Sequence, residues 1–278
     1  MKLILEKQWI KHINSLKTKG KATKAELKKE LVKAIESRIP KARFGIMFSG
    51  GIDSSLIAFI CKQKKADFIC YAVGMENAAD IEAAQKAAKL LDVKLKFRIF
   101  DLKETERIIK EVVKIVGPDV MKVGVGAVVY AAAELGRKDK INIFFSGLGS
   151  EELFAGYERH VLSKDINKEC WKGLKSMYKR DLLRDIPIAN KLKIEILTPF
   201  LDDDLIRTAM RIPGKEKLNK DYKKLILRKV SEELGLPKEI AWRKKKAAQY
   251  GSKFDKSIYK LTRKKGFKYK KDYLRSIL

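Results

Sequence analysis

The chain alternates between short apolar runs and longer segments in which apolar residues recur every three or four positions. The short runs, typical of buried strands, lie at residues 44–48, 68–73, 95–100 and 141–145. The longer segments, typical of helices, lie at residues 54–64, 80–91, 104–116 and about 125–135. Because apolar strands that alternate with helices form parallel sheets covered on both faces, the pattern predicts an α/β fold with a doubly wound parallel sheet of about five strands.

The two ends of the chain have a different pattern. Residues 3–17 read as a helix, and Thr23-Lys24-Ala25-Glu26 is a capping box that predicts a second helix ending before Pro40. After residue 153 the pattern is helical, with turns at the prolines that follow. We therefore predict a single domain over 1–278 with three parts: N-terminal helices (1–40), an α/β core (41–160) and a helical C-terminal part (161–278).

Two polar, glycine-rich loops follow predicted strands, at residues 49–55 and 146–152. Ligands bind at the carboxyl ends of the strands in such sheets. In Ser49-Gly50-Gly51-Ile52-Asp53-Ser54-Ser55 the glycines let the backbone approach a phosphate, and the following helix offers unpaired N–H groups. Asp53 would repel a phosphate unless Mg²⁺ lies between them, so we expect this carboxylate at the surface of a cleft. An ordinary turn with a helix cap is the alternative.

The charge of the chain is large and uneven. The net charge is +28, and residues 215–278 alone carry +15. A basic segment of this kind attracts polyanions, which include ATP, pyrophosphate and nucleic acid. A lysine-rich surface that only remains solvated is the other interpretation.

Other features of the sequence narrow the class of protein. No apolar run reaches the ~20 residues that a membrane span needs, and the start has no signal-peptide core. We therefore expect a cytoplasmic protein with no membrane partner. Cys61, Cys70 and Cys170 lack CxxC spacing, so we expect buried thiols rather than disulfides or metal ligands.

The two loops carry a family resemblance. The first resembles the SGG-x-DSS signature of pyrophosphatase-loop ATPases, which have a Rossmann-like sheet and split ATP between the α- and β-phosphates. The second, residues 146–157, resembles the SGEGSDE-x-F-x-GY motif of asparagine synthetases. Residues 26–40, 71–74, 199–202 and 243–252 also resemble segments of that family, in its order. The chain thus resembles an asparagine synthetase domain over roughly residues 26–255.

The resemblance implies a set of site residues around ATP and Mg²⁺. Phosphate contacts are implied for Ser49, Gly50, Gly51, Asp53, Ser54 and Ser55. Adenine contacts are implied for Val73 and Gly74, and AMP contacts for Ser146 and Gly147. The implied catalytic residues are Lys245, Asp53 and Glu151, of which Asp53 and Glu151 bind Mg²⁺ and Lys245 steadies the α-phosphorus. The register could instead select Lys244 or Lys246, and a solvated basic face is the alternative for the whole run.

The chain departs from the family pattern in two places. Glutamine-using members begin with a glutaminase domain whose nucleophile is an N-terminal cysteine, whereas Met1 is followed here by Lys2 and the first cysteine is Cys61. We expect no glutaminase domain, so that ammonia, another amine or a separate glutaminase subunit supplies the nitrogen. Leu148 replaces the family glutamate, which is implicated in proton handling and substrate contacts, neither of which a leucine can provide.

The function expected from the sequence is an ATP-dependent, AMP- and pyrophosphate-forming ligase. It would adenylate a small-molecule carboxylate for attack by ammonia or another amine. The alternative is an RNA-modifying enzyme of the same loop class, which would adenylate a base and hold RNA through the basic C-terminal part. A further alternative is a non-catalytic ATP-binding relative, which Leu148 would allow.

Overall fold

The computed structural model describes residues 3–244 and 247–278. Its sheet has five strands in the order β3-β2-β1-β4-β5, and every neighbouring pair is parallel. The strands are β1 (Phe44–Met47), β2 (Phe68–Met75), β3 (Leu95–Phe100), β4 (Ile143–Phe145) and β5 (Glu195–Leu197). The predicted α/β class and parallel sheet are confirmed.

The fifth strand lies where the sequence predicted helix. Glu195–Leu197 is only three residues long and partly exposed, so it has no run of buried apolar positions to mark it. Its pairing with β4, in which Leu197 lies opposite Phe145, makes it a strand. The sheet therefore includes a segment beyond residue 160, the predicted end of the α/β core. The three-part division of the chain stays a prediction.

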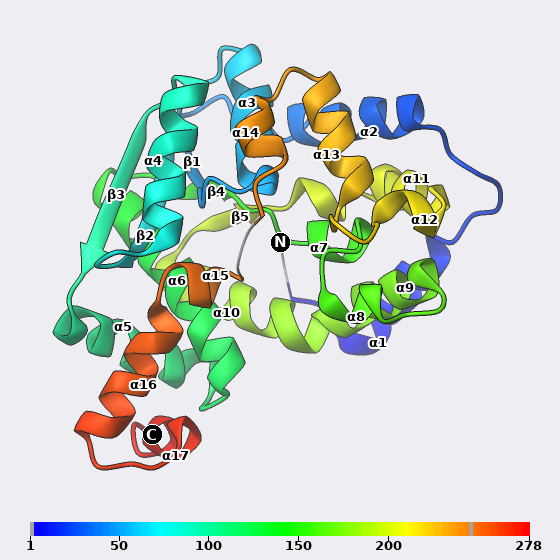
Figure 1. Ribbon diagram of the computed structural model, residues 1–278. Helices are drawn as coiled ribbons and strands as arrows, with labels where there is room; N and C mark the ends of the chain where they lie inside the picture. Colours follow the sequence, from blue (N-terminus) through cyan, green and yellow to red (C-terminus); the bar gives the residue numbers. More distant parts are fainter. Residues whose placement is uncertain (1–2, 245–246) are drawn as a thin grey trace.

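Helices cover both faces of the sheet (Figure 1). One face is covered by α3 (Ile52–Gln63) and α4 (Ala79–Leu91), and the other by α6 (Val120–Lys138), on which α5 (Leu102–Val116) packs. Helix α6 is longer than predicted, because Asp119 caps its N-terminus by accepting a hydrogen bond from the Lys122 N–H at 2.9 Å. A buried apolar cluster lies on each face, and α16 and α17 contribute to the one beside α5 and α6.

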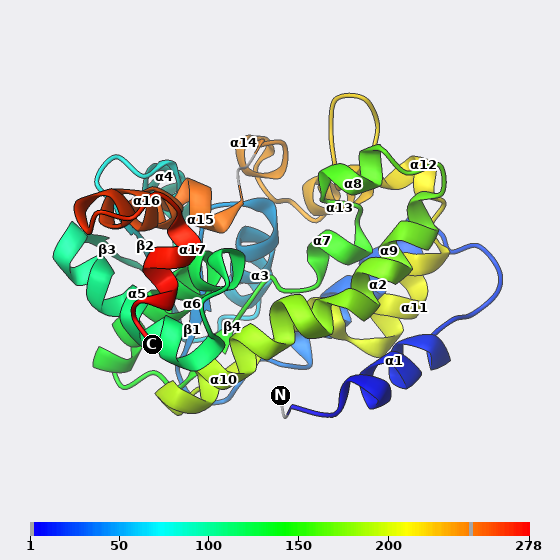
Figure 2. The ribbon, with the colours of Figure 1, turned by 90° about the horizontal axis from the view of Figure 1, so that it is seen from below.

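Most of the remaining helices form a layer beside the sheet, which Figure 2 shows from below, and the others pack against α5 and α6 on one face of the sheet. Together they are α7 (Ser150–Leu153), α8 (Glu158–Val161), α9 (Ile166–Met177), a π-helical turn (Tyr178–Leu182), α10 (Leu183–Leu192), a 3₁₀ turn (Pro199–Leu201), α11 (Asp203–Arg211), α12 (Gly214–Lys217), α13 (Leu225–Glu233), α14 (Lys238–Ala241), α15 (Ala248–Gly251), α16 (Phe254–Lys264) and α17 (Lys270–Arg275). None of the helices in the described part of the chain is long and apolar enough to cross a membrane.

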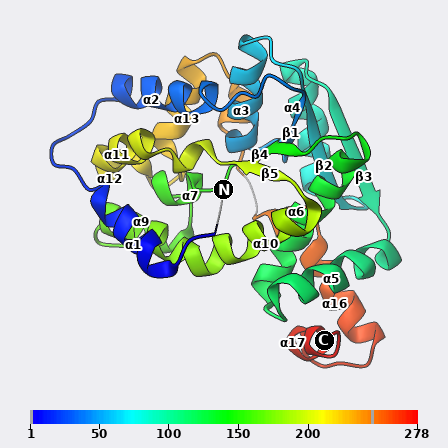
Figure 3. The same ribbon diagram turned by 180° about the vertical axis from the view of Figure 1, so that it is seen from behind.

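The N-terminal helices pack on this C-terminal layer rather than standing apart (Figure 3). Helix α1 (Glu6–Ser15) lies against α9, where the Trp9 indole N–H donates to the Leu174 carbonyl at 2.9 Å. Helix α2 (Lys24–Glu36) lies against α11 and begins with the predicted capping box, in which Thr23 and Glu26 bond to each other. The three cysteines are buried and reduced, as expected.

Candidate active site

The two glycine-rich loops lie side by side at the carboxyl edge of the sheet. They follow β1 and β4, which are adjacent parallel strands with Gly45 opposite Phe144. A Cβ atom on Gly147 would lie 2.9 Å from the Cβ of Asp53, so the loops are in direct contact. The topology thus places the loops as the sequence predicted.

The first loop has the backbone geometry of a phosphate-binding turn. Gly50 has a φ of +62°, and a Cβ there would lie 2.3 Å from the Ala83 carbonyl oxygen, so only glycine fits. Gly51 directly precedes α3, whose N-terminus has no side-chain cap hydrogen bond. The Ser55 hydroxyl is buried and has no hydrogen-bond partner among the described residues. The loop therefore presents helix N–H groups of the kind that bind phosphate.

Asp53 lies in a buried hydrogen-bonded cluster. Asp53 is 6% exposed, and its Oδ1 accepts a hydrogen bond from the Ser150 hydroxyl at 2.6 Å. The ammonium of Lys224 donates to both carboxylate oxygens at 2.8 Å. The expectation that Asp53 lies at the surface of a cleft is wrong, because Lys224 and Ser150 cover it.

Lys224 joins the two carboxylates that the sequence predicted as metal ligands. Its Nζ also lies 2.8 Å from Oε1 of Glu151 and donates to the Ser150 hydroxyl at 2.7 Å. Burial alone would lower the pKa of Lys224, but the charges of Asp53 and Glu151 raise it above the ordinary value. The cluster therefore holds a charged ammonium between two carboxylates.

No motif in the sequence indicated that Lys224 belongs to the site. It is one of many lysines in a basic segment, and it precedes α13 in a left-handed conformation with a φ of 57°. Gly156 makes room for it, since a Cβ there would lie 1.6 Å from Oε2 of Glu151 and 2.6 Å from Cε of Lys224. Only the packing of α13 beside the two loops brings this lysine to Asp53.

The carboxylates of Asp53 and Glu151 fit a magnesium site. Oxygens of both converge on one cationic nitrogen, each at 2.8 Å. Mg²⁺ typically takes one or two carboxylates and completes its shell with phosphate oxygens and water. The described residues hold no group of three or more metal-ligating side chains, so an ion here would take its further ligands from phosphate oxygens or water.

The end of β2, where Val73 and Gly74 were predicted to meet adenine, is covered by the segment that leads into α16. The Met75 N–H donates to the Ser252 carbonyl at 3.0 Å, and a Cβ on Gly74 would lie 3.4 Å from the same oxygen. β2 is the direct neighbour of β1, so these residues share an edge of the sheet with the first loop.

Arg243, the first residue of the basic run that follows α14, lies beside the same site. Lys245 and Lys246 lie outside the described residues, and Lys244 is exposed, with its ammonium 5.2 Å from the centre of the Tyr222 ring. Arg228 donates to the carbonyls of Ala241 at 2.6 Å and Arg243 at 3.1 Å, which ties the start of the basic run to α13.

Arg243 connects the basic run to the first loop. Its guanidinium donates to the Ser49 carbonyl at 3.2 Å and lies 3.9 Å from Asp80. Burial lowers the pKa of Arg243, and Asp80 opposes that effect. The cations of this region are thus placed at the edge of the sheet that bears the two loops.

Leu148 and Glu152 occupy different environments. Leu148 is partly buried and lines a cavity of about 30 Å³ together with Asp185, Asn190 and Thr198. Glu152 is 1% exposed and pairs with Arg180; burial raises the pKa of Glu152 to about 7, and Arg180 opposes that rise. Glu152 is therefore a buried group paired with Arg180, and its environment differs from that of the Leu148 side chain.

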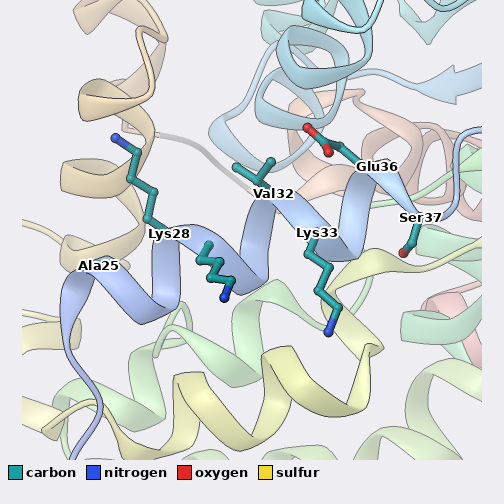
Figure 4. Close-up of a pocket in the computed structure, with 7 residues that line it drawn as sticks. Ala25, Lys28, Val32, Lys33, Glu36 and Ser37 are labelled. Atoms are coloured by element: carbon teal, nitrogen blue, oxygen red, sulfur yellow. The ribbon is translucent and has the colours of Figure 1, made fainter.

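A larger hollow of about 810 Å³ lies along α2, away from both loops. Figure 4 shows that Lys28 and Lys33 point in different directions from the helix. The hollow is lined by Ala25, Lys28, Lys29, Val32, Lys33, Glu36 and Ser37, none of which is a candidate site residue. Because a binding site needs convergent polar groups, we place the functional site at the loops.

The chain resembles two proteins named as asparagine synthetases over most of its own length. A relative in Methanocaldococcus jannaschii that carries the name of a glutamine-hydrolysing asparagine synthetase is 34% identical over 290 residues, covering 88% of this chain and 53% of the relative. The asparagine synthetase of Rattus norvegicus, also glutamine-hydrolysing by name, is 32% identical and covers 78% of this chain and 41% of its own length. The chain thus spans about half the length of these relatives.

Among solved structures, NMN synthetase from Francisella tularensis has a TM-score of 0.47 and 12% sequence identity, covering 91% of this chain and 93% of that chain. The asparagine synthase family matches residues 26–164 and 160–270 of the sequence. These matches include the first loop, the second loop and the basic run, and they confirm the resemblance that the motifs predicted. The chain belongs to the asparagine synthase family.

Proposed function

We propose that this protein is an ATP-dependent ligase that adenylates a carboxylate, releases pyrophosphate and passes the acyl group to an amine. The observation that carries the proposal is the meeting of Asp53, Glu151 and Lys224 where the two loops touch. Two carboxylates and a phosphate-binding turn at one edge of a parallel sheet suit the binding of a metal-bound triphosphate.

The residues have distinct proposed roles. The turn at 49–55, with Ser49, Gly50, Gly51, Ser54 and Ser55, holds the phosphates through its N–H groups and hydroxyls. Val73 and Gly74 contact the adenine, and Ser146 and Gly147 contact the AMP part. Asp53 and Glu151 would hold Mg²⁺, which neutralises phosphate charge when it is bound. Lys245, which lies outside the described residues, steadies the α-phosphorus.

The reaction has two steps whose atoms balance. A carboxylate oxygen of the substrate attacks the α-phosphorus, and the bond to the β-phosphate oxygen breaks to release pyrophosphate. The amine then attacks the acyl carbon, loses a proton, and AMP leaves. The cations around the loops include Lys224, Arg228 and Arg243. Their positive charges stabilise the negative charge that accumulates on the phosphate oxygens in the transition state.

The source of nitrogen is part of the proposal. The relatives described above are glutamine-hydrolysing by name. We take ammonia as the default nucleophile of this chain, with a separate glutaminase subunit as its supplier when glutamine is the donor.

The test is a pyrophosphate-release screen with ATP and Mg²⁺ across amino acids, other carboxylates and tRNA, with and without ammonia. We expect release with at least one small carboxylate and loss of that release in Asp53→Asn. Release with tRNA alone would favour the RNA-modifying alternative. ATP binding without release under any substrate would favour a non-catalytic relative.

A further inference from the structure

Lys224 occupies the point at which the two proposed metal ligands converge. Its ammonium contacts Asp53, Glu151 and Ser150 at 2.7–2.8 Å, and the residue is 5% exposed. An ammonium has three hydrogens to donate, and all of them face acceptors here. This arrangement differs from an exposed ion pair, which is held loosely and contributes little.

The position of the lysine has a physical reason. Two carboxylates directed at one point repel each other, and a buried carboxylate without a counter-charge is strongly unfavourable. The side chain of Asp53 is 9% exposed and that of Glu151 is 32% exposed, so water screens the first of them poorly. Lys224 supplies the cation that these two groups need when no other cation lies between them.

We propose that Lys224 is a positioning residue that stands in for the divalent cation between Asp53 and Glu151 until nucleotide binds, and so makes metal binding depend on nucleotide. The inference rests on the proposed function, because it takes both carboxylates as metal ligands. A metal ion arriving alone meets an ammonium already bonded to its ligands, and like charges repel. A triphosphate brings enough negative charge to compensate both cations.

A hydrogen bond holds the backbone just before Lys224, so we assign the exchange to the side chain. Arg228 donates to the Lys223 carbonyl at 2.9 Å and holds the turn before α13. The stem of Lys224 passes Gly156, where the absent side chain leaves it a path. A lysine suits this role, since it is a compact point charge on a flexible stem of four carbons.

The test measures binding of Mn²⁺, as a probe for Mg²⁺, to the full chain by electron paramagnetic resonance. Wild type is compared with Lys224→Met and with Lys223→Met, a matched control whose ammonium pairs with the exposed Glu158 at 2.7 Å. Without nucleotide, Lys224→Met should bind Mn²⁺ at least tenfold more tightly than wild type or Lys223→Met. With an ATP analogue that has a methylene group between the α- and β-phosphorus atoms, this difference should shrink.

Two further measurements separate failure of the role proposed for Lys224 from misfolding and from failure of the proposed function. Circular dichroism checks folding, and Lys224→Gln, which keeps hydrogen-bond donors without the charge, should reproduce the tighter metal binding if Lys224→Met does not fold. Asp53→Asn with the analogue tests the proposed function itself: unchanged Mn²⁺ affinity would remove Asp53 as a ligand. If Asp53→Asn weakens binding, but neither Lys224 variant binds Mn²⁺ more tightly than Lys223→Met without nucleotide, only the role of Lys224 is overturned.

Discussion

Replacing Asp53 with alanine is expected to cost about 3 kcal/mol of folding stability, in addition to its effect on turnover. Removing one partner of a buried ion pair typically costs about 3–5 kcal/mol, because the other charge stays buried without compensation. Here Lys224 would keep Glu151 at 2.8 Å, so the lower end of that range applies. The loss follows from the burial of Asp53, which is 6% exposed.

The magnitude can be isolated with a double-mutant cycle. Unfolding in urea, followed by circular dichroism, gives the stabilities of wild type, Asp53→Ala, Lys224→Met and the double variant. The double variant removes both charges, so its loss should be smaller than the sum of the single losses. We expect a coupling energy of about 2–3 kcal/mol, as found for residues in direct contact.

A matched exposed pair provides the control. Lys223 and Glu158 lie 2.7 Å apart with side chains that are 41% and 72% exposed. Such pairs typically couple by about 0.2–1 kcal/mol. If the cycle for Asp53 and Lys224 gives a coupling no larger than the cycle for Lys223 and Glu158, the reasoning from burial is refuted.

Three other predictions concern single residues. Burial lowers the pKa of Lys217 to about 8 from 10.5, so the unfolded chain binds more protons between these values and the stability contributed by Lys217 rises with pH. Methionine at this position carries no such penalty, so the free energy of unfolding of Lys217→Met relative to wild type should fall by about 3 kcal/mol between pH 8 and 10.5 in urea unfolding. A difference between the two proteins that stays constant with pH would contradict this. Gly156→Ala should lose about 1–3 kcal/mol in the same assay and weaken Mn²⁺ binding with nucleotide, because its Cβ would lie 1.6 Å from Glu151; unchanged values would show that the cluster tolerates the side chain. Leu148→Glu should raise asparagine formation from aspartate, ATP and ammonia, since general base help is typically worth about 10²–10⁴-fold; a wild-type rate of ~1–10 s⁻¹ would defeat that expectation.

Local patterns in the sequence determine the main strands and helices. β3 spans Leu95–Phe100, the range that its short apolar run predicted, and the capping box at Thr23 begins α2. These features depend on residues a few positions apart, such as hydrogen bonds between Thr23 and Glu26. The sequence also determined that both loops follow strands, and parallel pairing of β1 with β4 brought them together.

The candidate site was only partly predictable, for a reason of distance along the chain. The motifs identified Asp53 and Glu151, but they did not indicate that Asp53 is buried. They also did not indicate Lys224, which lies 171 residues from Asp53 in sequence. Lysines near and far from the site look alike in a chain with 63 Lys and Arg residues.

The tertiary structure alone decided that Lys224 contacts Asp53 and Glu151 and that a short segment forms the edge strand beside β4. β5 has three residues, and its strand character comes from pairing with β4 rather than from its own pattern. Lys224 reaches Asp53 because α13 packs beside the two loops and Gly156 leaves room for its stem. Periodicity and motifs depend on near neighbours in sequence, whereas such contacts depend on packing between elements far apart in the chain.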